Sequence, residues 1–295
     1  MKFLFSVLSI FIFLLTSCSE DKAANDTESG RLTVQLTDAP FPFDLVAEAN
    51  VTVFKVDARL ADGEDNESED MEDDSQSSFV TLMEEEIPVN LLDLTNGTTE
   101  QLADLEVPAG TYDLIRVYLK GITIVLTDGR SFDLKVPSGE QTGIKVFINP
   151  PLTVVGGLSS DLLLDFDVSR SFVAKGDSKS VDGITGFNFK PVIKVCNLST
   201  AGTLSGMVTT LQEEVSVPLE NAQISVLDTN EDPVTSGATD VDGNYTIMGL
   251  EAGTYKVFAS LNGYVISDIL EIQIVAANKT VQDFVLEAEM AEQGN

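Results

Sequence analysis

The tetrapeptide AGTY occurs twice in this 295-residue chain, within residues 106–117 (EVPAGTYDLIRV) and again within residues 249–260 (GLEAGTYKVFAS). Each copy precedes an alternation of apolar and polar residues, the pattern of a strand with one buried face. Glycine permits a tight corner with positive φ, and tyrosine can bury its ring while its hydroxyl stays near the rim. The repeat therefore predicts equivalent corners at Gly110 and Gly253 and equivalent strand starts at Tyr112 and Tyr255.

The same period of two extends over most of the chain. Leu32, Val34 and Leu36 alternate with polar residues, and residues 121–136 (GITIVLTDGRSFDLKV) read as two strands joined at an Asp-Gly turn. Helical periodicity is almost absent, and only residues 98–105 (TTEQLADL) suggest one or two helical turns. The pattern predicts an all-β chain.

The part that follows residue 201 contains an ordered series of short motifs: PLENAQI at 218–224, TDVDGNY at 239–245 and the second AGTY. Together they resemble the carboxypeptidase regulatory-like family, a transthyretin-like sandwich of seven strands, over residues 202–286. Asp240 and Asp242 are expected to cap backbone amides, and Gly243 to adopt a positive φ. The acidic DVDGN segment lacks the glutamate of a calcium loop, which favours a turn.

Residues 30–197 contain LTDAP at 36–40, LLDLTNG at 91–97 and PAGTYDLIR at 108–116. These segments resemble a bacterial lipoprotein domain of unknown function, family 4382. The resemblance implies a first β-sandwich, so we expect two sandwiches in tandem, followed by a polar tail at 287–295. The acidic run at 61–78 interrupts the pattern between two strands and predicts a disordered hairpin loop. Weak calcium binding by this run is the alternative.

The N-terminus predicts a lipid anchor. Its apolar run is too short to cross a membrane and fits a signal peptide at residues 1–17. Leu15, Thr16, Ser17 and Cys18 resemble a lipobox, so Cys18 is expected to carry the lipid, with residues 18–29 as a flexible tether. By resemblance to other lipoproteins, Ser19 argues against inner-membrane retention, and the acidic residues 20–21 imply export to the cell surface.

The amino-acid composition excludes several classes of catalytic and binding site. The chain has no histidine, which removes Ser-His-Asp and Cys-His nucleophile systems and histidine metal sites. Its net charge of −31, from 48 acidic and 17 basic residues, is unsuited to nucleic acid. With Cys18 lipidated, Cys196 has no disulfide partner and is expected to be a buried strand residue. No catalytic, metal or cofactor site is predicted.

Three functions are compatible with the sequence. The first is a non-enzymatic lipoprotein that binds a protein or glycan or supports an assembly on the outer membrane, facing the cell exterior. The second is carbohydrate binding by the C-terminal sandwich, with Tyr118, Tyr245 or Tyr264 as stacking platforms in a chain without tryptophan. The third, the least favoured, is a hydrolase built on Asp165 and Asp167, which alternate along one predicted strand.

Overall fold

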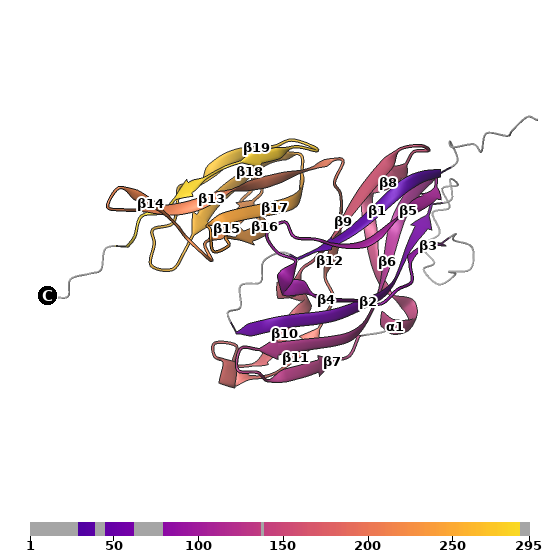
Figure 1. The fold of residues 1–295 in the computed structure, drawn as a ribbon, viewed down its shortest axis with the longest axis horizontal. Coiled ribbons are helices and arrows are strands. Elements are labelled where there is room, and N and C mark those ends of the chain that lie inside the picture. Colours follow the sequence, from indigo (N-terminus) through magenta and orange to yellow (C-terminus); the bar gives the residue numbers. More distant parts are fainter. Residues whose placement is uncertain (1–28, 39–44, 62–78, 137–138, 290–295) are drawn as a thin grey trace, which may run out of the picture.

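A computed structural model describes residues 29–38, 45–61, 79–136 and 139–289 (Figure 1). Strands dominate this part of the chain, and the expectation of an all-β protein built from sandwiches is confirmed. No helix among the described residues is long and apolar enough to span a membrane. Cys18, the acidic residues 20–21, most of the tether, the acidic run and the last six residues lie outside the described ranges.

The first sandwich contains two main sheets and a short ribbon. One sheet has four strands in the order β12-β9-β1-β5, with bounds β1 (Ser29–Thr37), β5 (Glu100–Pro108), β9 (Ser159–Phe166) and β12 (Ile193–Asn197). The other has six, namely β2 (Val46–Leu60), β3 (Phe79–Met83), β4 (Ile87–Asn90), β6 (Gly110–Leu126), β7 (Ser131–Leu134) and β8 (Ile144–Val154). The ribbon pairs β10 (Phe172–Gly176) with β11 (Ile184–Phe189).

Short helical turns join some of these strands: η1 (Leu91–Asp93), α1 (Gly139–Thr142), α2 (Val168–Ser171) and η2 (Val181–Gly183). The expected hairpin at 121–136 is present, because β6 and β7 pair antiparallel. Strands β2 and β3 also pair antiparallel, so the acidic run connects two neighbouring strands.

The apolar residues of the two main sheets meet in one core. Leu32 and Val34 of β1 are completely buried, as their alternation predicts, and they belong to the same cluster as Ile115 and Val117 of β6. At about 25 cal/mol for each Å² of apolar surface removed from water, such a two-sheet core is the main term that stabilises the sandwich.

The second sandwich has its own core, which includes Leu204, Ile224 and Val257. Its five-stranded sheet consists of β13 (Ala201–Gln212), β14 (Val215–Pro218), β17 (Asn244–Glu251), β20 (Lys279–Val281) and β21 (Phe284–Val285). Its four-stranded sheet follows the order β16-β15-β18-β19, with bounds β15 (Gln223–Leu227), β16 (Pro233–Ala238), β18 (Gly253–Ser260) and β19 (Leu270–Ile274). The body has more strand segments than the expected seven, because β14 is a short hairpin extension and β20 and β21 both run along β13.

The AGTY repeat is a shared corner, but its two glycines differ in backbone conformation. In each copy one alanine separates two strands that belong to different sheets: β5 from β6 and β17 from β18. Gly110 has a positive φ of +158°, whereas Gly253 is not among the residues with positive φ. The expected positive φ is present at Gly110 and was wrong at Gly253, and each glycine belongs to a paired strand.

Both corners instead share a hydrogen bond that the tyrosine hydroxyl donates. Tyr112 Oη donates to the carbonyl of Pro108 at 2.8 Å, and Tyr255 Oη donates to the carbonyl of Glu251 at 3.0 Å. Both bonds reach back four residues across the corner. The ring of Tyr112 is completely buried, whereas Tyr255 is partly buried against the second core.

The helical turns expected at 98–105 were wrong, because most of this segment forms β5. The register of β5 against β1 shifts beside Leu102, so Leu102 and Ala103 are consecutive buried residues. Such a bulge breaks the alternation of a strand and produces a spacing that resembles a helix.

Candidate functional site

The two sandwiches meet at a polar junction that contains the best candidate site. Among the described residues, hollows with volumes of about 30, 380, 570 and 510 Å³ lie along it, and residues of both sandwiches line each of these. The first sandwich contributes the ends of β1 and β9, the turn after η1, and β12. The second contributes mainly β16 and β17. Figure 1 shows β12 and β9 of the first body next to β16 and β17 of the second.

The end of β1 places Asp38 at this junction. Asp38 is only 4% exposed, and its Oδ1 accepts the backbone N–H of Val168 at 3.0 Å. Its Oδ2 is buried and accepts no hydrogen bond within the described chain. Burial, opposed by the Val168 N–H and reinforced by the charges of Asp165 and Asp167, raises the pKa of Asp38 well above its usual value.

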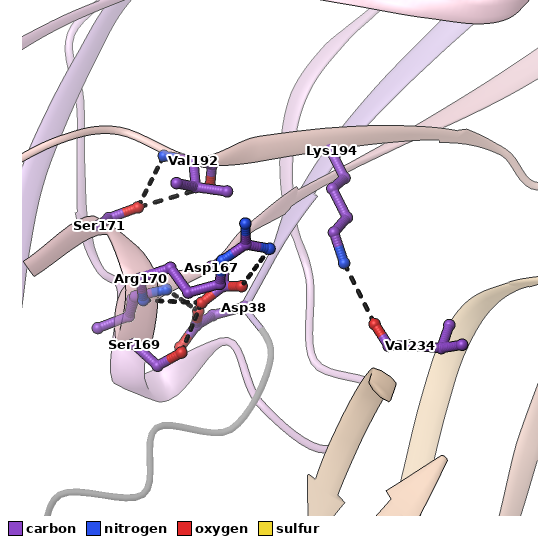
Figure 2. A network of polar contacts seen from close by, with 9 residues as sticks. Asp38, Asp167, Ser169, Arg170, Ser171, Val192, Lys194 and Val234 are labelled. Carbon is purple, nitrogen blue, oxygen red and sulfur yellow. Dashed lines mark hydrogen bonds and ion pairs between the residues drawn. The ribbon is translucent and has the colours of Figure 1, made fainter. Parts of the chain in front are cut away.

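Asp167 has a structural task beside Asp38. Figure 2 shows its carboxylate among Ser169 and Arg170. Asp167 Oδ1 accepts the backbone N–H of Arg170 at 2.9 Å and the hydroxyl of Ser169 at 2.7 Å, which makes it the N-cap of α2. The guanidinium of Arg170 lies 3.7 Å from Asp167 Oδ2.

The turn at Asn96-Gly97 connects the sandwiches directly. Asn96, at φ 57°, donates from Nδ2 to Asp240 Oδ2 at 3.2 Å and to the carbonyl of Asn244 at 3.1 Å. A Cβ on Gly97, where φ is +81°, would lie 2.8 Å from Thr246 Cγ2, so only glycine allows this close approach to β17.

Strand β12 provides two further contacts. Lys194 Nζ donates to the carbonyl of Val234 at 3.3 Å, and Figure 2 shows this contact from the first sandwich to the second. Cys196 is partly buried near Gly249 of β17, where an added Cβ would lie 3.6 Å from its Sγ. Burial first, and then the charges of Glu251 and Asp165, raise the pKa of the Cys196 thiol to about 11.

The carboxylate pair expected for a hydrolase does not lie on one strand face. Asp165 belongs to β9, which ends at Phe166, so Asp167 lies beyond the strand and caps α2. Because the carboxylate of Asp167 is held by backbone and hydroxyl donors, the geometry gives the pair no catalytic arrangement.

The tyrosines considered as sugar platforms are mostly occupied by packing. Tyr118 is 8% exposed and lies beside Phe54 and Lys55. Tyr245 is 1% exposed, and its hydroxyl donates to the carbonyl of Gln282 at 2.5 Å. Tyr264 is partly buried against the second core and forms an isolated bridge with Ala288. The rings of Tyr118 and Tyr245 are therefore closed to a sugar, and Tyr264 is the partly exposed ring of the three.

The second sandwich confirms the expected roles of Asp240 and Gly243 in the turn, whereas no backbone amide donates to the Asp242 carboxylate within the described residues. Asp240 Oδ1 accepts the backbone N–H groups of Asp242 and Asn244 at 3.0 and 2.8 Å, and Gly243 has φ +76°. The junction also includes two residues to which the sequence patterns assign no role. Asp38 lies in the LTDAP segment and Asn96 in LLDLTNG. A polar residue within a largely apolar motif was the feature of the sequence that could have indicated a site at each position.

No group of three or more cysteine, aspartate or glutamate side chains in the described ranges is arranged to hold a metal by itself. The lipid-attachment residue predicted by the sequence, Cys18, lies outside these ranges.

Comparison with family models gives two matches. The model described as "Domain of unknown function (DUF4382)" matches residues 29–191, more than half of the chain, and the carboxypeptidase regulatory-like domain matches residues 203–287. The two resemblances inferred from the sequence are thereby confirmed. A search of the curated proteins found no match.

Among solved structures, the chain is similar to three pilins. GBS52, a minor pilin of Streptococcus agalactiae, is 12% identical, with 89% of this chain and 98% of that chain covered and a TM-score of 0.29. The shaft pilin SpaA of Lactobacillus rhamnosus GG is 11% identical, with coverages of 90% and 99% and a TM-score of 0.26. The major pilin subunit BcpA of Bacillus cereus is 12% identical, with coverages of 89% and 71% and a TM-score of 0.27.

Proposed function

Because this chain belongs to the DUF4382 family and continues into a carboxypeptidase regulatory-like domain, we propose that it is a non-enzymatic lipoprotein of the cell envelope. In this proposal Cys18 carries the lipid, and the protein is attached to the outer membrane with its body facing the cell exterior. The two sandwiches then act as a binding or scaffolding module for a protein or glycan partner.

One observation supports the non-enzymatic part above the others. The acidic side chains at the junction already serve the fold: Asp167 caps α2, and Asp38 holds the backbone of Val168. A hydrolase would need a carboxylate pair directed at substrate, with one member as a proton donor. The absence of histidine from the whole sequence removes the most common alternative base.

The lipid anchor is supported by the residues before the body. The segment Leu15-Thr16-Ser17-Cys18 follows an apolar stretch of signal-peptide length, and a polar segment separates it from β1 at Ser29. An anchor on a polar tether leaves a folded body mobile above a membrane.

Cys18→Ala tests the anchor, with Cys196→Ala as the matched control because these are the two cysteines of the chain. We expect Cys18→Ala to lose labelling by a clickable fatty acid and to leave the membrane fraction, while Cys196→Ala remains labelled and membrane-bound. Protease added to intact cells should remove the wild-type body. Lipid labelling that persists in Cys18→Ala would contradict the proposal.

The non-enzymatic role requires a separate assay. The soluble chain from Ser19 onward should hydrolyse neither peptide nor glycoside substrates. Hydrolysis that disappears in Asp165→Asn would instead restore the carboxylate mechanism.

A further inference from the structure

The smallest of the junction hollows described above is lined mainly by polar residues. Its volume is about 30 Å³, which leaves room for one or two water-sized groups. The oxygen-bearing side chains of the lining are Thr37, Asp38, Asn96 and Asp165 from the first sandwich and Thr235, Ser236 and Thr246 from the second. Apart from Asn96, none of these side chains offers an N–H donor. The cavity is therefore rich in acceptors.

Two of the acceptors are buried without a hydrogen bond in the described chain: Asp38 Oδ2 and Asn96 Oδ1. The second polar atom of each of these two side chains already makes a hydrogen bond. Asp38 Oδ1 accepts from Val168, and Asn96 Nδ2 donates to Asp240 and Asn244, so the second oxygen of each residue is left for the cavity that both residues line.

The backbone holds these two residues at one place. Thr37 Oγ1 donates to the carbonyls of Leu94 and Thr98 at 2.9 and 3.1 Å. The backbone N–H of Asp38 donates to the carbonyl of Leu94 at 3.0 Å. The end of β1 is thus tied to both sides of the Asn96 turn. Asp165 joins them because β1 and β9 pair in parallel with Thr37 opposite Asp165.

Burying an acceptor without a partner costs about 1–3 kcal/mol, and burying an unpaired carboxylate costs more. Asp38 is buried in this way, and the carboxylates of Asp165 and Asp167 lie near enough to repel its negative charge. A bound cation would satisfy both oxygens and offset the repulsion. A single water could donate to the two oxygens but would leave the repulsion in place.

The chemistry of the lining selects the cation. Carboxylate, amide and hydroxyl oxygens are hard ligands, which suit Ca²⁺ and Mg²⁺. Mg²⁺ keeps several waters, for which a cavity of this volume has little room, whereas Ca²⁺ accepts many protein oxygens in a flexible arrangement. We propose that this cavity is a Ca²⁺ site, with Asp38, Asn96 and Asp165 as ligands, that joins the two sandwiches.

This assignment is compatible with the lack of a three-carboxylate metal cluster among the described residues, because only two carboxylates line the cavity. Two charged ligands favour an affinity typical of extracellular calcium modules, with a dissociation constant on the order of 10⁻⁴ M. The site would bind in the absence of the lipid anchor, so it does not depend on the proposed function.

The test uses the soluble chain from Ser19 onward in calorimetric titrations and thermal unfolding with CaCl₂ or MgCl₂ at constant ionic strength. We expect one Ca²⁺ site and a melting temperature that rises with Ca²⁺ and much less with Mg²⁺. Asp38→Asn should weaken Ca²⁺ binding at least tenfold. Asp242→Asn, an exposed carboxylate that does not line the cavity, is the matched control and should bind as the wild type does.

A second variant guards against a misfolded Asp38→Asn protein. Asn96→Gly removes the amide oxygen while retaining a residue suited to φ 57°, and it should also weaken binding severalfold. A third protein, in which the acidic residues of 62–74 become amides, should keep the site and lose only weak background binding.

Three results would overturn the proposal. In one, the wild type shows no Ca²⁺-dependent rise in melting temperature, which would leave a water or a protonated Asp38 in the cavity. In the second, folded Asp38→Asn and Asn96→Gly proteins bind as tightly as the wild type. In the third, neutralising residues 62–74 abolishes the saturable binding, which would place the calcium in the acidic run.

Discussion

At the residue scale, the two tyrosines of the AGTY repeat make the same hydrogen bond at both corners, whereas its two glycines differ in conformation. Tyr112 and Tyr255 each close a corner where the chain leaves one sheet for the other, through a hydroxyl bond to a carbonyl four residues earlier. Gly253 has open surroundings, since the nearest atom to an added Cβ is Tyr255 Cε2 at 3.9 Å. The repeated glycine is therefore not the part of the motif that demands its residue type at the second corner.

Tyr112→Phe should lower the free energy of unfolding by about 1–3 kcal/mol, because it leaves the Pro108 carbonyl without its side-chain donor at a buried ring. Tyr255→Phe should cost less, about 0.5 kcal/mol, because its bond is exposed to water. Urea denaturation of the soluble chain measures both changes. The control is Tyr264→Phe, whose hydroxyl makes no hydrogen bond within the described residues. A loss in Tyr112→Phe no larger than in this control would show that the corner does not depend on the hydroxyl.

At the element scale, β13 organises the second sandwich. It pairs with β14 and β17 along its length and with β20 and β21 in parallel. The backbone between β20 and β21 passes so close that a Cβ on Gly206 would lie 2.6 Å from the carbonyl carbon of Gln282 and closer still to its oxygen. The requirement at Gly206 is thus a close approach of two backbones.

Gly206→Ala should destabilise the second sandwich by about 2 kcal/mol or more, since either β13 or Gln282 must move. Gly253→Ala is the matched substitution in the same sandwich and should change stability by no more than about 0.5 kcal/mol. Differential scanning calorimetry of the soluble chain compares them. Similar losses from the two substitutions would contradict this account of β13.

At the scale of the whole molecule, the two cores are separate and the junction between them is polar. Asn96 and Lys194 make hydrogen bonds from the first sandwich to the second, and Cys196 faces Gly249. The thiol therefore reports on the contact between the sandwiches.

In the chain from Ser19 onward, Cys196 is the single cysteine and should react slowly with a disulfide reagent at pH 8, because burial keeps it as the neutral thiol. Its folded pKa, about 11, lies above the ordinary value of 9.0. The neutral thiol therefore contributes stability that is fully present below pH 9 and is lost as the pH rises through about 11. Reaction rates measured from pH 7 to 11, with and without urea, test this. Equal rates in the folded and unfolded chains would contradict a protected thiol.

Local sequence determined the strands and the turn at residues 240–243 of the second sandwich. Alternation predicted the buried faces of β1 and β6, and Asp240 and Gly243 predicted a turn that the structure contains, because these features depend on residues a few positions apart. The bulge at Leu102 was misread because the partner strand, and not the local pattern, sets the register of β5.

The candidate site was decided by tertiary structure alone. Asp38 and Asp165 lie far apart in the sequence and become neighbours only because β1 and β9 pair in parallel, a pairing that requires a long crossover and leaves no local signature. Asn96 joins them through the bonds between Thr37 and the turn after η1. The sequence shows that these polar residues exist within apolar motifs, whereas the packing of one sandwich on the other determines that their oxygens share one small cavity.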